Sequence, residues 1–577
     1  MRWTRDAARA VAIACAAVGL GCAGELEPPV PAAHPDDPTP RRGGVLHLAS
    51  FADMRVIDPA NIADGLVPRV NQAIFAGLVD YDGSGRVVPD LAERWEVLDG
   101  GRRYRFFLRA GVRFHDGEEL TADDVVRSME RALHPSAPNP YASFYESIVG
   151  FAEIQDKKSE ALAGVTAEGK YVVDVRLKDV DATFLPALGL QVLRPVCKSA
   201  GRRYSDTWQP CGAGPFKLLP GGWDKGRQIT LVRHDGYFRP GLPYLDAISW
   251  SFLVNTATQR FKFETGALDL LQDFRQAELL RFQRDPRWKP LGEYEAERQV
   301  GAESMNTELA PFDNVEIRRA VAAAIDRDHI RLIRPGNLRA AGLPIPPAVL
   351  GANPSLPGQR YDLGAALEHM KKAGYPYDPA TGRGGYPHPI RYVIYRQGLS
   401  EYTVQLLAQD LAKIGLRLDV QVVNYPSYLA ITHRRGKAQM TSAGWQQDYP
   451  DPSDFLDPLF HSRAINDEDS NNVAFYKNPR LDALLDRARR ELDPPTRQRL
   501  YDEAQGIVVD EAPWAFTHYY RWYDAHQAYV RGYKPHPVWT HNVSFSWLDR
   551  GPSAQAGLAP RGPSTVLGLL GGRRGAP

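Results

Sequence analysis

The 577-residue sequence predicts an α/β fold, and two kinds of pattern support that prediction. Residues 389–423 read as a buried strand, a helix with one apolar face and a second, alternating strand, which together form a β-α-β unit. In residues 103–109 and 171–177, apolar and polar side chains alternate as they do in half-buried strands. Because strands and helices interleave along the chain, we expect parallel strands joined by right-handed crossovers.

Capping residues mark the start of several further helices. Thr121 stands before an amphipathic segment and has a carboxylate three residues on, as in a capping box. Asn314 and Asn478 precede two more segments with apolar residues at helical spacing. The pair Pro494-Pro495 is expected to separate the second of these from a helix that continues to Val508.

Composition excludes several classes of protein. The chain is 43% hydrophobic and 24% charged, as globular proteins are. Lys+Arg 70 against Asp+Glu 69 leaves a net charge of +1, so the chain lacks the basic excess typical of a nucleic-acid-binding protein. It contains no nucleophile elbow, phosphate-binding loop or dinucleotide fingerprint. We therefore expect no nucleic-acid partner, no catalytic residues and no cofactor.

Residues 1–21 have the features of a secretory signal. Three arginines precede an apolar run over residues 10–20, which is shorter than the roughly 20 residues that span a bilayer. A buried core helix is the other interpretation of this run. The pair Gly21-Cys22 resembles the cleavage box of bacterial lipoproteins, so we expect lipid attachment at Cys22. The two residues before Gly21 depart from the usual box, and secretion without lipid is the alternative.

Two segments lack the composition of a folded core. Residues 22–43 are rich in proline and poor in large apolar side chains, so we expect an extended tether. Residues 550–577 are rich in glycine and proline, and we expect a disordered tail.

Two cysteines remain in the body of the chain. Cys197 and Cys211 are expected to pair as a disulfide, because the signal directs the protein to an oxidising compartment. A zinc site would need more ligands than the sequence supplies nearby, so no metal site is expected.

The stretch GWQQDYPDPSDF, residues 444–455, has three possible interpretations: a turn-rich loop, an acidic catalytic or metal site, or a ligand-binding segment. Its spacing does not match a calcium loop. Asp451, Asp454 and the following Asp457 are expected to start turns and cap helices. Asp448 differs, because it lies three residues after Trp445 and directly downstream of the β-α-β unit, where α/β clefts form.

Several ordered blocks resemble the peptide-type family of bacterial extracytoplasmic solute-binding proteins, which serve ATP-driven importers. The longest block is IFAGLVDYDGSGRVVPDLAERWEVLDGGRRYRFFLRAGVRFHDGEELTADDVVRSMERAL, residues 74–133. The other blocks span residues 212–248, 258–271, 305–330 and 444–455. The resemblance covers residues 44–548, almost the whole mature body.

The resemblance implies a two-lobed fold of the type II periplasmic-binding-protein kind, with an extra domain inserted in the first lobe and a cleft between domains I and III. Hinges are expected near Met305 and His518. By matching blocks, domain I is expected at residues 44–72, 205–303 and 516–549, the extra domain II at 73–204, and domain III at 304–515.

The resemblance also implies a binding site. In peptide receptors of the family, the aspartate at the position of Asp448 binds the α-ammonium group of the ligand. The ligand backbone is expected beside residues 443–446 on one side, and beside Asp64 and Gly65 on the other. The first of these segments consists of Ala443, Gly444, Trp445 and Gln446.

One position departs from the family pattern. Ser442 stands where oligopeptide-binding relatives often have arginine. Arg434 or Arg435 is then a candidate for binding a ligand carboxylate, although exposed positions are the more ordinary interpretation of both.

We therefore expect a monomeric receptor, in the periplasm or outer envelope and anchored by lipid at Cys22. It would deliver peptides to the membrane permease of an ABC importer. One alternative keeps the fold but changes the ligand to a nickel complex, haem, an opine or an oligosaccharide. A remote alternative is an envelope hydrolase that uses Asp448.

Overall fold

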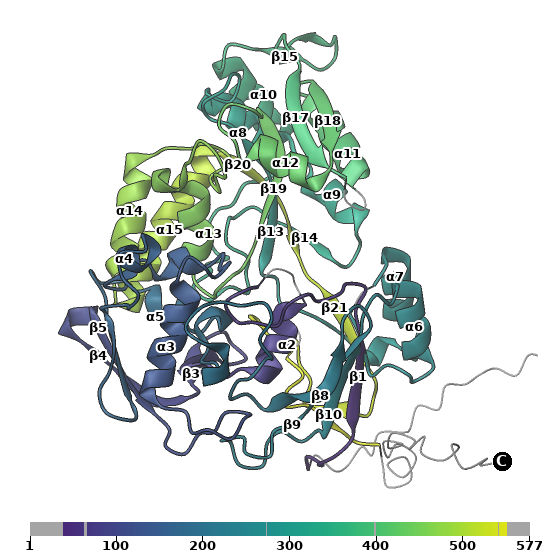
Figure 1. Cartoon of the computed structure of the whole chain (residues 1–577). Coiled ribbons are helices and arrows are strands. Elements are labelled where there is room, and N and C mark those ends of the chain that lie inside the picture. Colours follow the sequence, from purple (N-terminus) through teal and green to yellow (C-terminus); the bar gives the residue numbers. More distant parts are fainter. Residues whose placement is uncertain (1–38, 63–65, 273, 397–399, 540–541, 551–577) are drawn as a thin grey trace, which may run out of the picture.

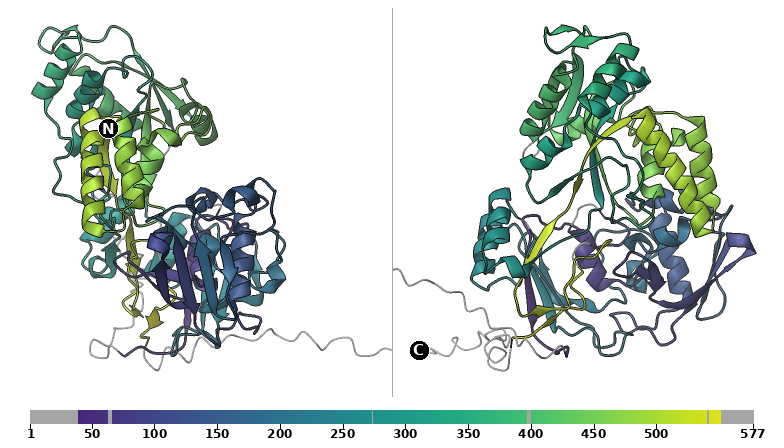
Figure 2. Two further views of the ribbon diagram at one scale, coloured as in Figure 1. Left: turned by 90° about the vertical axis from the view of Figure 1, so that its left-hand side faces the viewer. Right: turned by 180° about the vertical axis from the view of Figure 1, so that it is seen from behind.

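The computed structural model describes residues 39–62, 66–272, 274–396, 400–539 and 542–550, and it has two main parts. We call residues 299–520 the upper lobe, and the described residues before and after them the lower body. Figures 1 and 2 show the two parts one above the other, joined by extended segments. The predicted signal, Cys22, Asp64 and Gly65 lie outside the described residues, as do most of the tether and the tail.

The lower body is built on two sheets. One has the strand order β1-β10-β9-β8 and the other β11-β21-β12. Their strands are β1 (Val45–Ala49), β8 (Phe216–Asp224), β9 (Gln228–Arg233), β10 (Ala247–Ser251), β11 (Leu270–Leu271), β12 (Gly292–Tyr294) and β21 (Tyr523–His526). The helices of this region are α2 (Val67–Ile74), α6 (Thr256–Glu264) and α7 (Gln276–Arg284). Strands β22 (Val530–Arg531) and β23 (Trp547–Leu548) form a small separate pair.

An extra region of the lower body contains a sheet of order β4-β5-β7-β6 and a β2-β3 pair. Its strands are β2 (Val79–Tyr81), β3 (Val87–Pro89), β4 (Ala92–Leu98), β5 (Arg103–Leu108), β6 (Val165–Ala167) and β7 (Val172–Arg176). Its helices are α3 (Ala122–Leu133), α4 (Phe151–Gln155) and α5 (Phe184–Leu188). The predicted alternation in β5 is confirmed, because Tyr104, Phe106 and Leu108 are buried. Thr121 caps α3, with its backbone N–H donating to the Asp124 carboxylate at 3.1 Å.

The upper lobe has a six-stranded sheet of order β14-β20-β13-β19-β17-β18. The strands are β13 (Gln299–Met305), β14 (Leu338–Ala340), β17 (Ile390–Tyr395), β18 (Leu418–Val423), β19 (Met440–Gln446) and β20 (Trp514–Tyr520). A short hairpin, β15 (Tyr377–Asp378) and β16 (Arg383–Gly384), stands apart. The helices are α8 (Val315–Ala324), α9 (Arg327–Ile333), α10 (Leu363–Lys372), α11 (Ser400–Ala412), α12 (Tyr425–Thr432), α13 (Ser453–Phe460), α14 (Pro479–Arg490) and α15 (Pro494–Glu511).

The predicted β-α-β unit is confirmed as β17, α11 and β18. The two strands pair in parallel, from Ile390 opposite Leu418 to Tyr395 opposite Val423. The apolar face of α11 is buried, with Leu407 and Leu411 both 0% exposed. Side-chain caps at Asn314 and Asn478 open α8 and α14 as predicted.

One expectation in the upper lobe is refined and one needs correction. The predicted break between two helices is confirmed, since α14 ends at Arg490 and α15 begins at Pro494. Pro494 and Pro495 form the first turn of α15, which Asp493 caps. Proline suits the first turn of a helix because its fixed φ is helical and because the N–H that it lacks would have no partner within the helix there. The boundaries expected at residues 303/304 and 515/516 cut through β13 and β20, yet both strands pair along their length within the upper sheet. The chain therefore crosses between the parts at residues 295–298 and 521–522, and not near Met305 and His518.

Two covalent or charged links hold the extra region to the rest of the lower body. Cys197 and Cys211 form a disulfide with their Cα atoms 5.5 Å apart. Arg131, from α3, donates to Asp58 at 2.6 Å, and both side chains are almost fully buried. The indole N–H of Trp208 donates to the same carboxylate at 2.8 Å. This buried ion pair has its charges and donors matched within the chain.

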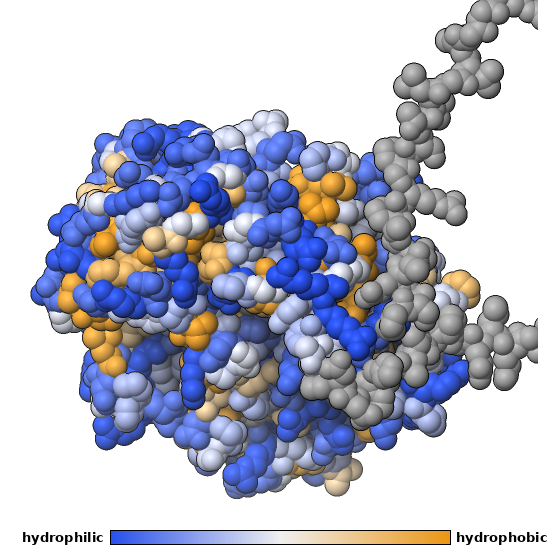
Figure 3. Space-filling model, turned by 90° about the horizontal axis from the view of Figure 1, so that it is seen from below, coloured by the Kyte–Doolittle hydropathy of each residue, from blue (hydrophilic) through white to orange (hydrophobic). Residues whose placement is uncertain are grey.

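On the face shown in Figure 3, hydrophobic residues form small patches between hydrophilic ones. Such a surface is ordinary for a globular protein in contact with water. Within the described ranges, no helix combines the length and the apolar character needed to cross a bilayer.

Candidate functional site

A cavity of about 820 Å³ opens on the side of the upper lobe that faces the lower body. Most of its wall comes from β13, β17, β19, β20 and the helices α9, α11 and α12. Phe274 of the lower body and Trp522 of a crossing segment complete it. The cavity therefore lies in the upper lobe and reaches the lower body at Phe274. Its size is within the range of small-molecule and cofactor sites.

The alternation of β13 and β19 makes one face of the sheet the cavity wall. Gln299, Gly301 and Glu303 of β13 lie opposite Gln446, Gly444 and Ser442 of β19, and all six line the cavity. The residues between them on β13, Val300 and Ala302, belong to the core beneath α13, α14 and α15. Because side chains of a strand point alternately to opposite faces, this register places the side chains of Gln299 and Glu303 on the cavity side of β13, whereas on β19 consecutive residues from Ser442 to Gln446 all border the cavity.

Two glycines face each other in the middle of this wall. Gly301 and Gly444 are directly paired across β13 and β19. A Cβ at Gly301 would lie 2.3 Å from the His518 ring, and one at Gly444 would lie 3.0 Å from the Val300 carbonyl oxygen. Neither position accepts a larger residue without movement, so the backbone stays accessible there.

Strand β19 has a free edge beside the cavity. Strand β17 pairs with β19 only at Met440 and Thr441. Among the described strands, β13 is the single partner of residues 442–446. The hydroxyl group of Tyr428 donates to the Ser442 carbonyl. The backbone from Ala443 to Gln446 can therefore accept a further strand.

Aromatic side chains form much of the remaining wall. Tyr395 packs against Tyr425 and Tyr428, with ring centroids 5.0 and 4.9 Å apart. Trp445, Tyr520 and other rings also line the cavity. Such a lining gives a ligand a large apolar contact area with hydroxyl groups at its margins.

An arginine and a glutamate of the lining, Arg334 and Glu303, come from different places in the upper lobe. The guanidinium of Arg334, just after α9, lies 6.0 Å from the Tyr520 ring centroid. Burial, with a further contribution from the Arg334 charge, lowers the pKa of His518 to about 4, so this histidine is neutral at pH 7. Glu303 is 2% exposed, and its carboxylate accepts from the Tyr392 hydroxyl at 2.6 Å. The sequence offered no signal for Arg334 or Glu303.

Asp448 lies beyond the end of β19, where the upper lobe meets the extra region. The neighbouring ring of Tyr449 packs on Phe144 of the extra region at 5.2 Å. Asp448 is half-buried, and burial raises the pKa of its carboxyl to about 7, although a hydrogen bond from the Tyr141 hydroxyl acts in the other direction. No ion pair with Asp448 occurs among the described residues. Its carboxyl therefore has a hydroxyl partner but no cation.

The later aspartates hold this segment in place. Asp454 accepts the backbone N–H of Asp448 at 2.8 Å. Asp451 accepts the Ser453 backbone N–H and pairs with Arg497, and Asp457 pairs with Arg463. The predicted role in turns and helix starts is confirmed for Asp451. These groups are buried rather than on the surface, and burial raises the pKa of Asp454 and Asp457.

The other predicted site residues divide into two groups. Ala443, Gly444, Trp445 and Gln446 line the cavity. The Trp445 ring also packs against the core beneath α13, α14 and α15. Its indole N–H lies near the Asp454 carboxyl but is not within hydrogen-bond geometry of it. Arg434 does not line the cavity, because its exposed side chain pairs with Glu468 at 2.7 Å. Arg435 pairs with Glu308 and Asp467 in the same way.

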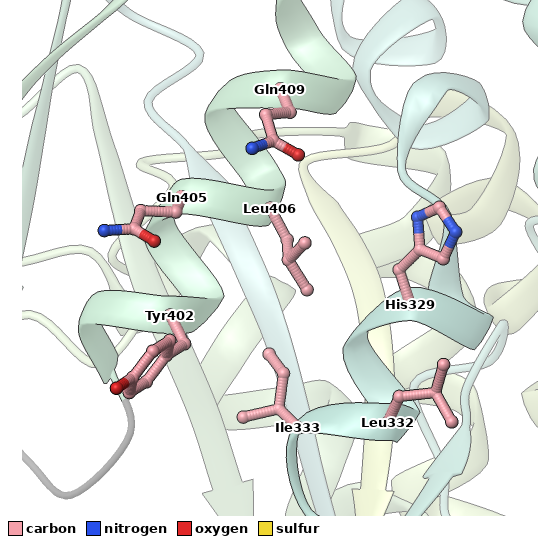
Figure 4. Close-up of a pocket in the computed structure, with 7 residues that line it drawn as sticks. All are labelled: His329, Leu332, Ile333, Tyr402, Gln405, Leu406 and Gln409. Atoms are coloured by element: carbon pink, nitrogen blue, oxygen red, sulfur yellow. The ribbon is translucent and has the colours of Figure 1, made fainter.

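A second, smaller pocket lies between α9 and α11. Its volume is about 600 Å³, and Figure 4 shows Leu406 of α11 and Ile333 of α9 pointing toward one another between the two helices. Ile333 lines both this pocket and the main cavity, so the two are neighbours on either side of this residue.

One cluster of metal-ligand types occurs within the described residues: Asp116, Cys197 and Cys211. The two sulfur atoms are joined in the disulfide, so they are not thiolate ligands.

Comparison with known families identifies the chain. The family model for bacterial extracellular solute-binding proteins, family 5 (middle region), matches residues 86–467. The chain belongs to this family. Its α/β fold is that of the type II periplasmic binding proteins, as predicted.

Two relatives and one solved structure illustrate the range of the family. Heme-binding protein A of Haemophilus influenzae is 30% identical over 481 residues, covering 79% of this chain and 83% of the relative. The probable deoxycholate-binding periplasmic protein YgiS of Escherichia coli is 28% identical over 524 residues, covering 85% and 91%. The structure of DppA from Helicobacter pylori with the peptide STSA is 27% identical, covers 88% of this chain and 99% of DppA, and has a TM-score of 0.70.

Membership of the family establishes the general role. The protein is an extracytoplasmic solute-binding protein of the kind that serves ABC importers. Its relatives are binding proteins, which is consistent with the expectation that it is not an enzyme.

Proposed function

We propose that the protein captures peptides, with the α-ammonium group bound by Asp448 and the peptide backbone paired to β19. The cleft then closes over the peptide, and the receptor presents it to the permease. The observation that carries this proposal is the combination of a cation-free carboxyl at one end of β19 and an unpaired strand edge along the next residues.

The electrostatic state of Asp448 supports an amine-bearing ligand. Its carboxyl is partly protonated at neutral pH because burial raises its pKa to about 7. An ammonium group would favour the ionised form and form a charge-assisted hydrogen bond with it. Tyr141 already donates to this carboxyl from the extra region, so a ligand would contact both parts.

The free edge supports a peptide backbone. Residues 443–446 offer main-chain donors and acceptors, and the paired Gly301 and Gly444 keep side chains away from them. Main-chain pairing gives affinity that is largely independent of sequence, as a general peptide receptor requires. DppA, which is solved with the peptide STSA, shares this fold at 27% identity.

Three further features belong to the same proposal. A ligand carboxylate would meet Arg334 rather than Arg434, because Arg334 lines the cavity. Asp64 and Gly65 would flank the ligand from the lower body. The receptor would be a monomer anchored through Cys22, so palmitate labelling should be lost in Cys22→Ser and kept in Cys15→Ser.

Substitution of Asp448 by asparagine tests the anchor. We expect Asp448→Asn to weaken binding of the hexapeptide Ser-Ala-Ser-Ala-Ser-Ala roughly a hundredfold or more, because one partner of a desolvated pair is removed. N-acetylation of the peptide should weaken binding to the wild-type protein similarly, and should have little further effect on the variant. Isothermal titration calorimetry measures all four affinities.

The control is Asp419→Asn, an exposed position on β18. It should bind the peptide as the wild-type protein does. Unchanged affinity in Asp448→Asn would refute the anchor.

A non-peptide ligand is the alternative, and the aromatic wall is the observation that favours it. Rings of Tyr395, Tyr425 and Tyr428 would suit a flat or polycyclic solute. The relatives named for heme and deoxycholate carry such ligands in their names. Mass spectrometry of ligand released by denaturing the purified protein separates the two functions.

A further inference from the structure

Glu303 is a buried carboxyl in the wall of the main cavity. It is 2% exposed, yet it is one of the residues that line the cavity. On β19, Ser442 lies directly opposite it. Its carboxylate accepts from the Tyr392 hydroxyl of β17, on the far side of β19 in the sheet order. The carboxyl is thus fixed in direction by a neighbour and stands in the cavity wall with little exposed surface.

Within the described part of the chain, the contacts of Glu303 are with hydroxyl groups, and Arg334, which lines the same cavity, forms no ion pair with it. Tyr392 donates to it, and Tyr428 and Ser442 line the cavity beside it. Among the described residues, no ion pair includes Glu303. Burial raises its pKa to about 8 despite the hydrogen bond from Tyr392. A buried carboxylate without a cation is unfavourable, so the group can ionise readily only when a cation arrives.

We propose that Glu303 selects ligands with a second basic nitrogen, which donates to its carboxylate inside the closed cleft. This inference rests on the proposed peptide function and names the ligand class: peptides with a lysine or arginine side chain beyond the first residue. Within β19, Ser442 and Gln446 are four positions apart, which is about 13 Å of strand, and Asp448 lies beyond the end of that strand. The second nitrogen therefore belongs to a later residue and not to the α-ammonium group.

A purely structural role makes different predictions. The Tyr392–Glu303 hydrogen bond joins β17 to β13, so it could serve only to hold the sheet together. In that case, Glu303→Gln would lower the thermal stability of the ligand-free protein and leave ligand preference unchanged. If Glu303 selects cations, the same substitution removes an uncompensated carboxyl. The melting temperature without ligand then stays the same or rises, and the preference is lost.

The experiment compares wild-type protein with Glu303→Gln on the hexapeptide Ser-Ala-Ser-Ala-Ser-Ala. Lysine, or norleucine as its uncharged counterpart, replaces positions 2 to 6 one at a time. At one position we expect the wild-type protein to bind the lysine peptide at least tenfold more tightly than the norleucine peptide. In Glu303→Gln this ratio should fall to about one. Glu308→Gln, an exposed partner of Arg435 and Lys477, is the control and should keep the wild-type ratio.

The inference is overturned if the ratio is near one at every position in the wild-type protein, or if Glu303→Gln keeps it. Either result leaves the peptide function standing, because the parent hexapeptide still binds. If no peptide binds, the proposed function fails, and ligands released from the two proteins purified from the same cells decide the role of Glu303. Release of compounds with a basic nitrogen from the wild-type protein, and their depletion from Glu303→Gln, supports it. Release of only non-basic compounds refutes it.

Discussion

Asp58 and Glu303 are both buried carboxyls, but of the two only Asp58 has a cation partner among the residues that the structure describes. Asp58 receives Arg131 and Trp208 at the junction between α3 and the segment that follows β1. Glu303 receives one tyrosine hydroxyl at the wall of the cavity. The Asp58 pair is complete without a ligand and favours a fixed geometry. Glu303 has no cation among the described residues, so a ligand would have to supply one, as in a binding site.

The connections between the parts of the molecule also differ in how firmly they are held. The junction in the lower body has an ion pair and a disulfide that join segments far apart in sequence. The upper lobe is joined covalently to the lower body only through the crossings at residues 295–298 and 521–522, with the cavity beside them. Its other contacts with the extra region are noncovalent, and include Tyr449 on Phe144 and the ion pair between Arg489 and Asp181. We therefore expect the extra region to move with the lower body, and the upper lobe to move relative to both.

The largest expected effect comes from breaking the complete pair. Arg131→Met leaves Asp58 buried without its cation, and we expect the free energy of unfolding to fall by about 3–5 kcal/mol. Urea unfolding followed by circular dichroism measures this. The matched control is Arg227→Met, which removes an exposed pair with Asp224 and should change stability by about 0–1 kcal/mol. Equal losses in the two variants would contradict the difference between the buried pair and the exposed one.

A smaller effect on the free energy of unfolding is expected from the ionisation of Glu303 as the pH changes. The folded pKa of Glu303 is about 8, above its ordinary value of 4.5, so the folded state keeps a proton that the unfolded chain releases. Folded-state stability is therefore highest at low pH for this group and is lost as pH rises toward 8. Between pH 6 and pH 8 the loss amounts to about 2 kcal/mol.

The measurement is the difference between wild-type protein and Glu303→Gln in unfolding free energy, without ligand, at both pH values. Other buried carboxyls titrate in both proteins and cancel in the difference. A wild-type protein that loses no more stability than the variant would contradict an uncompensated Glu303.

The local elements could be predicted from the sequence because the residues that determine them lie close together along the chain. The β-α-β unit and the caps at Thr121 and Asn314 depend on residues within a few positions of each other. The family blocks supplied the fold and directed attention to Asp448. Glu303 could not be found in this way. Its place in the cavity wall depends on β13 pairing with β19, more than a hundred residues later.

The errors have the same origin. The position of Arg434, shortly before the block at residues 444–455, makes it a candidate to bind a ligand carboxylate. Its partner in the structure, Glu468, lies on a loop whose approach to Arg434 the sequence does not reveal. The expected hinges near Met305 and His518 fell inside strands for a similar reason, since only the pairing of β13 with β20 shows where the upper sheet ends.

The unpaired edge of β19 has a consequence for self-association. An exposed strand edge can template pairing with another copy of the same chain, which is a route to aggregation. Here the edge from Ala443 to Gln446 is recessed in a cavity whose walls include Tyr425 and Trp522. A single extended chain needs less room to reach this edge than a strand that already belongs to the sheet of another folded molecule. The unpaired edge of β19 is thus available to a ligand while pairing with another copy of the chain is disfavoured.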